Sequence, residues 1–513
     1  MRTWAVRPSS PSPTRLIDLA EHFNLALHSE TPNVLLTGIT MNSRDVEPGD
    51  LYLGLPGARF HGATFSKDAV ARGAVAILTD ASGAVDATAA GVPVLLTPNS
   101  PRDIAGHLAA WIYGTVTGGP LTLGVTGTNG KTSTVHFLDA LLTQLGRKTG
   151  LSSTAQRRIG AEVVVSSLTT PEAPELHGLL ARMHEAGVDA ALLEVSAHAL
   201  TRHRVDGVMF HVAAFTNLSH DHLDDYADMD EYFEAKLQLF TPEHSRKAVV
   251  SLDTPAGFAV VDRAGVDVVT ISSTPGVASD WVVTVADEQP DSTAFTLSSA
   301  HGTVSTRVPV IGRHMAANGG LAIAMLVEAG IDFGEIRAVL DRDGAITASL
   351  PGRAVHVPVT DGPNVYVDSG HSPDAFAKTL ESVRSLTRGR VIMIAGANGD
   401  RDALKRPEMG REAALGSDVL IITDHQPRSE DPALIREAVL AGARKAKPEG
   451  DIREIAAPEA AIRAAVAEAT PTDTILWAGL AEKEYREVAG VKIPFSVLGE
   501  TRAALAEAGW VSA

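Results

Sequence analysis

A glycine-rich turn between an apolar run and a helical stretch limits most strongly what this chain can fold into. Residues 121–134 read LTLGVTGTNGKTST, and the turn ends in Gly130, Lys131 and Thr132. The backbone N–H groups of such a turn, at the start of a helix, form a cradle for anions. The lysine adds a mobile positive charge, and the threonine hydroxyl is a ligand for nucleotide-bound Mg²⁺. The pattern therefore predicts a strand, a phosphate-binding turn and a helix.

The turn departs from the general phosphate-loop pattern. That pattern has glycine six residues before the lysine, where this chain has Val125, and glycines instead occupy positions 124 and 127. Glycine-lysine-threonine also arises by chance, so an ordinary strand-turn-helix without a nucleotide is the alternative at this point. We expect ATP binding, with a variant of the loop.

Composition narrows the class of protein. The 513 residues predict about three domains, each of roughly 100 to 200 residues. A formal charge of −18 argues against nucleic acid or an anionic membrane as the main partner. The absence of cysteine excludes disulfides and thiolate chemistry. We find no signal peptide at the start and no apolar run long enough to span a bilayer, so we expect a cytoplasmic protein without membrane insertion.

The first two thirds of the chain show an α/β pattern. Short apolar runs with one helix, expected at 63–73, predict a small mixed unit, and helices at 102–113 and 135–145 flank the strand of the phosphate loop. Apolar runs at 190–195 and 212–215 suit buried parallel strands. Between 248 and 311 we expect alternating β segments, and then a helix at 315–329.

The last third of the chain again alternates between predicted strands and predicted helices. Pro351 and Gly352 form a seam at which periodic structure ends. After it, apolar runs alternate with helical stretches, which predicts a second doubly wound sheet. These strands are expected at 365–368, 391–395, 419–423 and 475–478.

Polar residues follow two of the predicted central strands. Glu194 and His198 lie at the end of the first, and residues 215–224, FTNLSHDHLD, lie at the end of the second. Open α/β sheets bind ligands beyond the carboxyl ends of their strands, so both segments are candidates for a Mg²⁺ site. The alternatives are that Glu194 pairs with a buried lysine and that His198 is a core histidine. Lys236, on the flank of an apolar helical stripe, is on sequence alone more typical of a surface lysine.

Several segments in the right order resemble the Mur ligases, and within that family the MurE type. The resemblance covers nearly the whole chain. It rests on GVTGTNGKT at 124–132, LTTP at 168–171, EVSAHAL at 194–200, FTNLSHDHLD at 215–224 and EAKLQLF at 234–240. It continues in NSRDVEPGDLYLGLPG at 42–57, PGR at 351–353, DSGHSPDAF at 368–376, GDRDALKRP at 399–407 and PRSEDP at 427–432.

The resemblance implies a reaction. Enzymes of this type add the third amino acid of the peptidoglycan stem peptide, which serves cell-wall growth, cell shape and division. ATP phosphorylates the γ-carboxylate of D-Glu in UDP-MurNAc-L-Ala-D-Glu, and the amine of a free amino acid attacks the acyl phosphate. The implied cofactors are ATP, Mg²⁺ at two sites and CO₂ held as a lysine carbamate. A monomer that binds no nucleic acid is expected.

The resemblance also implies three α/β domains. A small mixed domain at residues 1–117 would bind the UDP-substrate. A central domain with a phosphate loop and a mostly parallel sheet at 118–350 would bind ATP. A Rossmann-like domain at 351–513 would bind the amino acid.

Site residues follow from the matching motifs. The ATP-binding positions are Gly127, Thr128, Asn129, Gly130, Lys131, Thr132, Asn318, Arg353, Asp368 and His371. The metal ligands are Thr132 and Glu194 for one ion and His222 and Lys236 for the second, with Lys236 carbamylated to N6-carboxylysine. Lys131, His222 and Lys236 are the catalytic residues. The UDP-substrate would contact Met41, Ser43, Thr169, Thr170, Ser196, Arg202 and Arg204, and position 202 holds arginine where many relatives have glutamine.

The amino-acid pocket departs most from the family pattern. The implied positions are Arg401, His425, Gln426, Pro427, Arg428, Gly479 and Lys483. Relatives that add diaminopimelate carry Asp-Asn-Pro-Arg where this chain has residues 425–428, and Arg401 and Arg428 are retained to hold a carboxylate. Lys483 replaces a glutamate that accepts the distal ammonium, and Glu482 or Glu484 takes that role only if the register slips by one residue. Diaminopimelate, lysine, ornithine, diaminobutyrate or a residue without a distal amine all remain open.

Two other functions compete with this one. One is a related ligase, such as a folylpolyglutamate synthetase or the ligase that adds the terminal dipeptide. The other is a noncatalytic Mur-like paralogue that only binds nucleotide. The intact Lys131, Thr132, Glu194, His222 and Lys236 favour catalysis.

Overall fold

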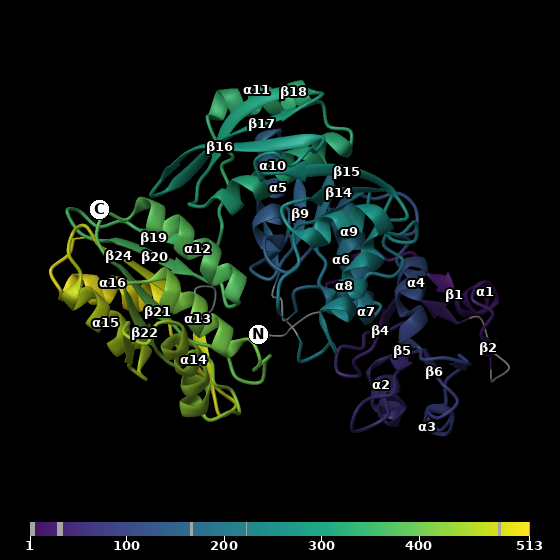
Figure 1. Cartoon of the computed structure of the whole chain (residues 1–513). Coiled ribbons are helices and arrows are strands. Elements are labelled where there is room, and N and C mark those ends of the chain that lie inside the picture. The colour runs from purple at the N-terminus through teal and green to yellow at the C-terminus, as the bar shows by residue number, and fades with distance from the viewer. Residues whose placement is uncertain (1–5, 28–33, 165–167, 222, 481–483, 512–513) are drawn as a thin grey trace.

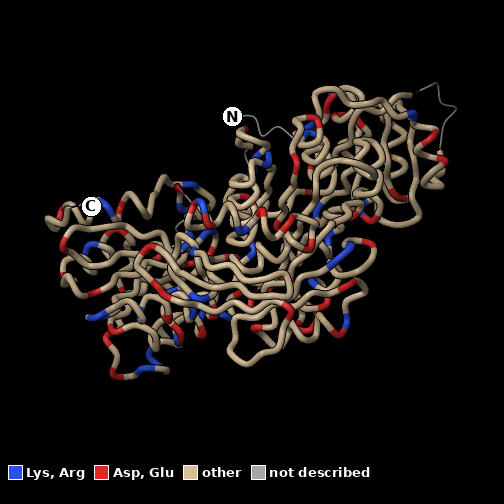
Figure 2. The backbone as a smooth tube through the Cα atoms, turned by 90° about the horizontal axis from the view of Figure 1, so that it is seen from above, with Lys and Arg blue, Asp and Glu red and all other residues tan. Residues whose placement is uncertain are grey.

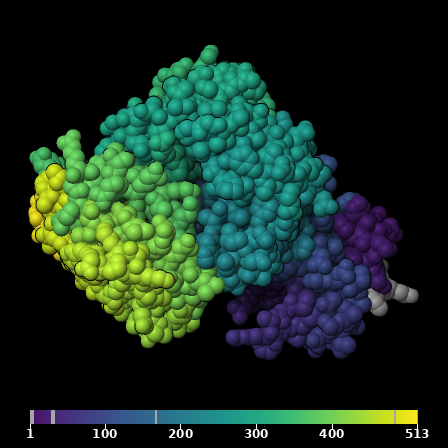
Figure 3. Space-filling model, viewed as in Figure 1, coloured from purple at the N-terminus to yellow at the C-terminus, as the bar shows by residue number. Residues whose placement is uncertain are grey.

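Three sheets with flanking helices follow one another along the chain (Figure 1). The computed structural model describes residues 6–27, 34–164, 168–221, 223–480 and 484–511. Figure 3 shows the C-terminal part packed against the middle part, with the N-terminal part at the other end. The α/β fold class with three units and a mostly parallel central sheet is confirmed.

The N-terminal part is a five-stranded sheet whose central strands are parallel. Its order is β2 (Ala26–Leu27), β7 (Val94–Leu96), β6 (Ala76–Thr79), β5 (Asp50–Gly54), β4 (Gly38–Thr40), and β1 (Thr14–Arg15) pairs separately with β3 (Leu35–Leu36). The helices are α1 (Leu16–His22), η1 (Gly62–Phe65), α2 (Ser66–Arg72), α3 (Ala84–Thr88) and α4 (Arg102–Ile112). The helix expected at 63–73 thus begins with a 3₁₀ turn, which the His61 side chain caps, and ends at Gly73 with φ +118°.

The central sheet has eleven strands, parallel in the middle and antiparallel at both edges. Its order is β11 (Glu162–Val164), β10 (Arg157–Ile159), β9 (Thr149–Ser152), β12 (Ala190–Glu194), β8 (Leu121–Thr126), β13 (Val212–Phe215), β14 (Lys247–Ser251), β15 (Asp267–Ser272), β16 (Trp281–Gln289), β17 (Ser292–Ser299), β18 (Gly302–Val308). Strand β8 lies between β12 and β13, so the phosphate loop and both polar segments leave the same sheet edge.

Helices cover this sheet. They are α5 (Lys131–Gln144), α6 (Ala173–Glu185), α7 (Ala197–Thr201), α8 (Met229–Leu237), η2 (Gln238–Phe240), α9 (Pro255–Arg263), α10 (Arg313–Glu328) and α11 (Phe333–Asp343). Residues 248–311 are therefore not purely β as expected, because α9 connects the parallel strands β14 and β15. Parallel neighbours need such a crossover, and Pro255 at the first helical turn favours it.

The C-terminal sheet has six strands, five of them parallel. Its order is β19 (Val355–Val357), β20 (Asn364–Asp368), β24 (Thr474–Ala478), β21 (Val391–Ala395), β22 (Val419–Ile422), β23 (Asp451–Glu454), with a separate hairpin of β25 (Tyr485–Val488) and β26 (Val491–Pro494). The helices are α12 (Pro373–Leu386), α13 (Arg406–Gly416), α14 (Pro432–Ala446), α15 (Pro458–Glu468) and α16 (Val497–Glu507).

Contacts between the three parts are both apolar and polar. One buried apolar cluster includes residues of the central sheet and of the C-terminal sheet, such as Leu123 and Met393. Near the N-terminus, Arg7 pairs with Asp50 of β5, and the N–H of Ser9 donates to Glu185 of α6 at 2.8 Å. The residues before β1 thus touch both the N-terminal sheet and a helix of the central part.

Charge is spread over the whole molecule. Figure 2 shows acidic and basic residues mixed along every part of the described chain. No helix in the described ranges is long and apolar enough to cross a membrane.

Candidate active site

The phosphate loop requires glycine at two positions. Gly127, with φ +141°, follows β8 directly, and a Cβ there would lie 1.9 Å from the Thr216 hydroxyl oxygen. Gly130, with φ +89°, is the N-cap of α5, and a Cβ there would lie 2.8 Å from Asn318 Oδ1. Only glycine combines these backbone angles with so little space. The loop ends at the N-terminus of a 14-residue helix, which favours bound anions.

Lys131 and Lys236 meet at one carbonyl group. Lys131 Nζ donates to Gly127 O at 2.9 Å and to Thr128 O at 2.7 Å. Lys236 Nζ, from α8, donates to the same Gly127 O at 3.0 Å and lies 4.1 Å from the centre of the Tyr232 ring. The surface position that Lys236 would take on sequence alone is wrong, since the residue is only 1% exposed.

Burial changes the acid–base properties of both lysines. Desolvation lowers the pKa of Lys236 well below its usual range, and the charge of Lys131 lowers it further. Desolvation also lowers the pKa of Lys131, against the attraction of Glu194 and Asp221. A buried amine without a full counter-charge favours its neutral form, which is the nucleophilic form.

Glu194 and Thr132 supply oxygen atoms beside the loop. Glu194 ends β12, is 1% exposed, and accepts the N–H and the hydroxyl of Thr154 at 3.0 and 2.9 Å. The Thr132 hydroxyl accepts a hydrogen bond from Arg353 Nη2 at 3.0 Å. A carboxylate and a hydroxyl oxygen are ligands that Mg²⁺ prefers. The donor set therefore fits one magnesium ion.

His222, expected to bind a second ion, lies outside the described residues. Within those residues no group of three or more histidine and acidic side chains is arranged to hold a metal. The second metal site stays a prediction.

The segment after β13 is hydrogen-bonded to the phosphate loop. Asn217 O accepts the N–H of Thr128 at 2.9 Å, and Asn217 Oδ1 accepts the N–H of Asn129 at 3.0 Å. The N–H of Ser219 donates to the Thr128 hydroxyl at 3.0 Å. These bonds hold Thr128 and Asn129 in place before any ligand binds.

C-terminal residues reach the same loop. Asp368 accepts the N–H groups of Ala354 at 2.9 Å and Gly370 at 2.7 Å, and so orients the backbone next to Arg353. Asn129 Nδ2 donates to Asp374 Oδ2 at 2.9 Å. His371 is exposed, with Nδ1 2.8 Å from Ser369 O.

The positions expected for the UDP-substrate form two groups. Near Glu194, the Thr170 hydroxyl donates to Glu194 O at 2.8 Å and accepts the N–H of Ser196 at 3.2 Å. The Thr169 hydroxyl lies 3.0 Å from that of Thr154. Met41 and Ser43 instead follow β4 in the N-terminal part, and no described hydrogen bond or ion pair joins them to the loop.

The two arginines of this set pair with acidic side chains. Buried Arg204 lies 2.8 Å from Glu172, whereas exposed Arg202 lies 3.5 Å from Asp225.

The amino-acid positions gather at the ends of β21, β22 and β24. His425 is 1% exposed, and a Cβ on Gly479 would lie 2.1 Å from its Cε1, so the ring packs directly on that backbone. Burial lowers the pKa of His425 to about 3, and the charge of Arg486 acts in the same direction. Both ring nitrogens and Gln426 Oε1 are buried without a hydrogen-bond partner in the described structure.

Arg428 and Arg401, the cations expected to hold a carboxylate, both contact acceptors of the chain itself. Arg428 Nε lies 3.9 Å from Glu487 Oε2, and Arg401 Nη1 donates to Asp400 O at 3.0 Å. Arg428, with φ +53° after the buried Pro427, donates to Gly399 O at 3.1 Å, and Arg401 is exposed. Lys483 lies outside the described residues, so the predicted repulsion of a distal ammonium is not tested.

Sequence reasoning missed three residues of the site. Thr154 holds Glu194, Asp374 holds Asn129, and Lys405 pairs with Asp221 at 2.6 Å. Asp374, Lys405 and Asp221 occur inside the motifs already noted, but only the fold shows that they meet these partners.

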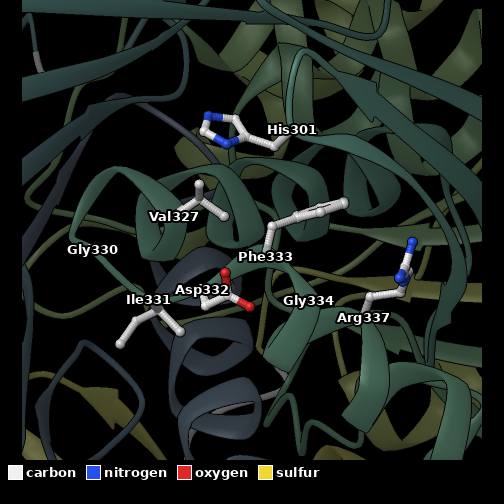
Figure 4. A pocket seen from close by; sticks show the side chains of 8 residues that line it. All are labelled: His301, Val327, Gly330, Ile331, Asp332, Phe333, Gly334 and Arg337. Carbon is white, nitrogen blue, oxygen red and sulfur yellow. The ribbon is translucent and has the colours of Figure 1, made fainter.

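A separate cavity lies away from these residues. Figure 4 shows it between the turn at His301 and the connection from α10 to α11, lined by Val327, Ile331 and Phe333 among others. Its volume is about 390 Å³. It contains none of the predicted site residues. The candidate site is therefore located by its side chains, where three parallel strands end.

Comparisons with known proteins agree with this geometry. Family descriptions match in three segments: "Mur ligase family, catalytic domain" at residues 35–110, "Mur ligase middle domain" at 125–326 and "Mur ligase, glutamate ligase domain" at 352–480. A protein of Leifsonia xyli subsp. xyli named UDP-N-acetylmuramyl-tripeptide synthetase is 50% identical over 508 residues, 99% of each chain. The chain belongs to the Mur ligase family.

Other Mur ligases are also similar over nearly the full length. A UDP-N-acetylmuramoyl-L-alanyl-D-glutamate–2,6-diaminopimelate ligase of Streptomyces avermitilis is 42% identical over 95% of this chain and 96% of its own. A solved structure of a ligase with the same name superposes with a TM-score of 0.67 at 26% identity, and covers 97% of this chain and 99% of its own. Mur ligases are ATP-dependent enzymes that form C–N bonds, generally with Mg²⁺, and this chain is such a ligase.

Proposed function

We propose that this Mur ligase adds the third amino acid to the γ-carboxylate of D-Glu in UDP-MurNAc-L-Ala-D-Glu. The observation that carries the proposal is the meeting of Lys131 and Lys236 at Gly127 O, beside the buried carboxylate of Glu194. The names of the similar proteins support this substrate, and the cytoplasm is where it would be used.

The reaction would proceed in two steps. A γ-carboxylate oxygen of the dipeptide bonds to the terminal phosphorus of ATP, and ADP leaves. The amine nitrogen then bonds to the acyl carbon, phosphate leaves and the nitrogen loses a proton. Negative charge grows on phosphoryl oxygens in both steps, so fixed cations and N–H donors stabilise the transition states.

Individual residues have defined parts in this scheme. The loop at 127–132 would bind phosphate oxygens through the Lys131 ammonium and the N–H groups of residues 130–132, since the N–H groups of Thr128 and Asn129 donate to Asn217. Thr132 and Glu194 would hold one Mg²⁺, which would neutralise phosphate charge. Arg353, Asn318, Asp368 and His371 complete the nucleotide site. Thr169, Thr170, Ser196 and Arg204 receive the muramoyl dipeptide, with Arg202 at the edge, and Met41 and Ser43 receive the uridine diphosphate.

Lys236 would act as a carbamate. A neutral amine nitrogen attacks the carbon of CO₂ and releases a proton, which leaves an anionic carboxylate on a long side chain. The burial of Lys236 and its lowered pKa favour that neutral amine. Together with His222, the carbamate would hold the second Mg²⁺.

Product analysis tests the proposal. Enzyme, ATP, Mg²⁺ and UDP-MurNAc-L-Ala-D-Glu are incubated separately with diaminopimelate, lysine, ornithine, diaminobutyrate and amino acids without a distal amine, and the nucleotide product is weighed by mass spectrometry. One candidate should add its mass less one water. No increment with any of them, alongside intact ADP binding, would overturn the proposal and favour a paralogue that only binds nucleotide.

A further inference from the structure

The side chain of Asn129 connects the phosphate loop to a helix of the C-terminal part. Asn129 Nδ2 donates to Asp374 Oδ2 at 2.9 Å and lies 3.4 Å from the hydroxyl oxygen of Ser372. Ser372 is the N-cap of α12 and is 1% exposed, and Asp374 lies in the first turn of that helix. Figure 1 shows α12 on the side of the C-terminal part that faces the central sheet. The contact therefore joins the loop to the C-terminal part.

The backbone of Asn129 is fixed within the central part. Its carbonyl oxygen accepts the Thr216 hydroxyl at 2.6 Å and Asn217 Nδ2 at 3.0 Å, and its N–H donates to Asn217 Oδ1 at 3.0 Å. The side-chain amide nitrogen carries two hydrogens and also lies 3.3 Å from Ser219 Oγ. Asn129 thus takes its backbone position from the central part, whereas the orientation of its amide depends on both parts.

Lys378 balances the charge that Asp374 brings close to the phosphate loop. Its Nζ donates to Asp374 Oδ2 at 2.9 Å from one turn further along α12. A carboxylate without that partner would repel the phosphates expected at residues 130–132, because like charges repel more strongly where water is partly excluded. A charged acceptor also holds an N–H donor more tightly than a neutral one does. The ion pair therefore suits Asp374 to hold the Asn129 amide beside a bound phosphate.

We propose that Asp374 is a positioning residue through which the seated C-terminal part fixes the Asn129 amide and, with it, the shape of the phosphate loop. Asn129 directly precedes Gly130, so an amide that rotates freely leaves the loop less ordered. Order that exists before the ligand arrives lowers the entropic cost of binding. The coupling is reciprocal, since nucleotide in the loop must favour the contact with α12 as much as the contact favours nucleotide. This inference rests on the proposed function, because it assigns the phosphates of ATP to this loop.

Calorimetric titration with ADP and Mg²⁺ tests this role without turnover. Asp374→Ala should weaken ADP binding about tenfold, which corresponds to about 1.4 kcal/mol. In the Asn129→Ala background, which leaves α12 intact, the same substitution should cost no more than about twofold further, as expected of two residues that act through one contact. Asp374→Ala also removes an acidic residue from a first helical turn. The matched control is Glu459→Ala, which does the same in α15 and should bind ADP like wild type.

Hydrogen exchange supplies a readout that a role confined to α12 would not change. In wild type, saturating ADP should slow amide exchange both in the phosphate loop and at residues 372–378. In Asn129→Ala, saturating ADP should still protect the loop but no longer residues 372–378, because the hydrogen bond that joins them is absent.

Three outcomes would overturn the inference. Equal ADP affinity in wild type and Asp374→Ala would show that the contact does not act on the loop. A double variant whose loss equals the product of the two single losses would show that Asn129 and Asp374 act independently. Protection of residues 372–378 by ADP that persists in Asn129→Ala would show that the coupling takes another route. By contrast, a wild-type enzyme that binds ADP but forms no amide would refute the proposed function and not this role of Asp374.

Discussion

At the scale of single residues, the Lys131 ammonium is the group of the phosphate loop that we expect to bind the negatively charged phosphates of ATP. Its ammonium already donates to two carbonyl oxygens at 2.9 and 2.7 Å, so it exchanges these for phosphate oxygens without a large movement. We expect Lys131→Ala to lower kcat at least about 10³-fold, since fixed cations stabilise the growing charge. Steady-state ADP release measures this. Activity within tenfold of wild type would contradict the role, and exposed Lys445→Ala is the control.

Lys236 differs because its chemistry depends on CO₂. We expect Lys236→Ala to lower kcat about 10²-fold or more, because the ligand of the second metal is lost. Wild-type enzyme stripped of CO₂ should lose activity and regain it with bicarbonate. A rate that does not respond to bicarbonate after stripping would count against the carbamate.

His425 makes stability depend on pH. Its pKa is about 3 in the folded chain and about 6.5 when unfolded, so the unfolded state binds more protons between these values. Stability therefore falls as the pH drops below 6.5, by about 3 kcal/mol from this group at pH 4.5.

The comparison of wild type with His425→Gln checks this prediction. The fall in melting temperature between pH 7.5 and pH 4.5 should be smaller in the variant, which has no group to protonate. Equal falls would mean that the imidazole is not held neutral by burial.

At the scale of elements, the fit between the phosphate loop and the segment after β13 depends on Gly127. A methyl group there would overlap the Thr216 hydroxyl and meet a φ of +141°, so the loop must shift. Gly127→Ala should weaken ADP binding about tenfold or more, because a displacement of about an ångström disrupts phosphate contacts. Calorimetric titration measures the affinity.

Gly146→Ala is the matched control for that substitution. Gly146 also has a positive φ, +75°, but its Cβ would meet no atom within 4 Å. The variant should lose about 1 kcal/mol of stability from backbone strain and keep its ADP affinity. Equal losses of affinity in both variants would assign the effect to strain and not to the contact with Thr216.

At the scale of the whole molecule, the central and C-terminal parts share an apolar core, and the core of the N-terminal part is separate. The N-terminal part has two apolar clusters of its own, whereas one cluster spans the central and C-terminal sheets. The Tyr366 hydroxyl also donates to Pro290 O at 2.8 Å between those two parts. Calorimetry should therefore show more than one unfolding transition. ADP with Mg²⁺ at about 100 times Kd should stabilise the transition of the central and C-terminal parts by about 2.7 kcal/mol. A single transition that shifts as a whole would contradict this.

Much of the fold follows from local patterns. Buried parallel strands such as β13 and β21 begin and end where continuous apolar runs predict, because both sheet faces are covered. The helix α9 was missed, since residues 255–263 are short and lie among β segments. The glycines of the phosphate loop were predictable because their backbone angles are a local requirement.

The chain's own residues determined the phosphate loop, the alternation of strands and helices, and the types of side chain that follow each strand, since all of these depend on neighbours in the chain. Only the tertiary structure decided that Lys236 is buried beside Lys131, that Thr154 holds Glu194 and that Lys405 meets Asp221. These partners lie on different strands, helices and sheets, and burial and charge pairing between them arise only when the sheets pack together.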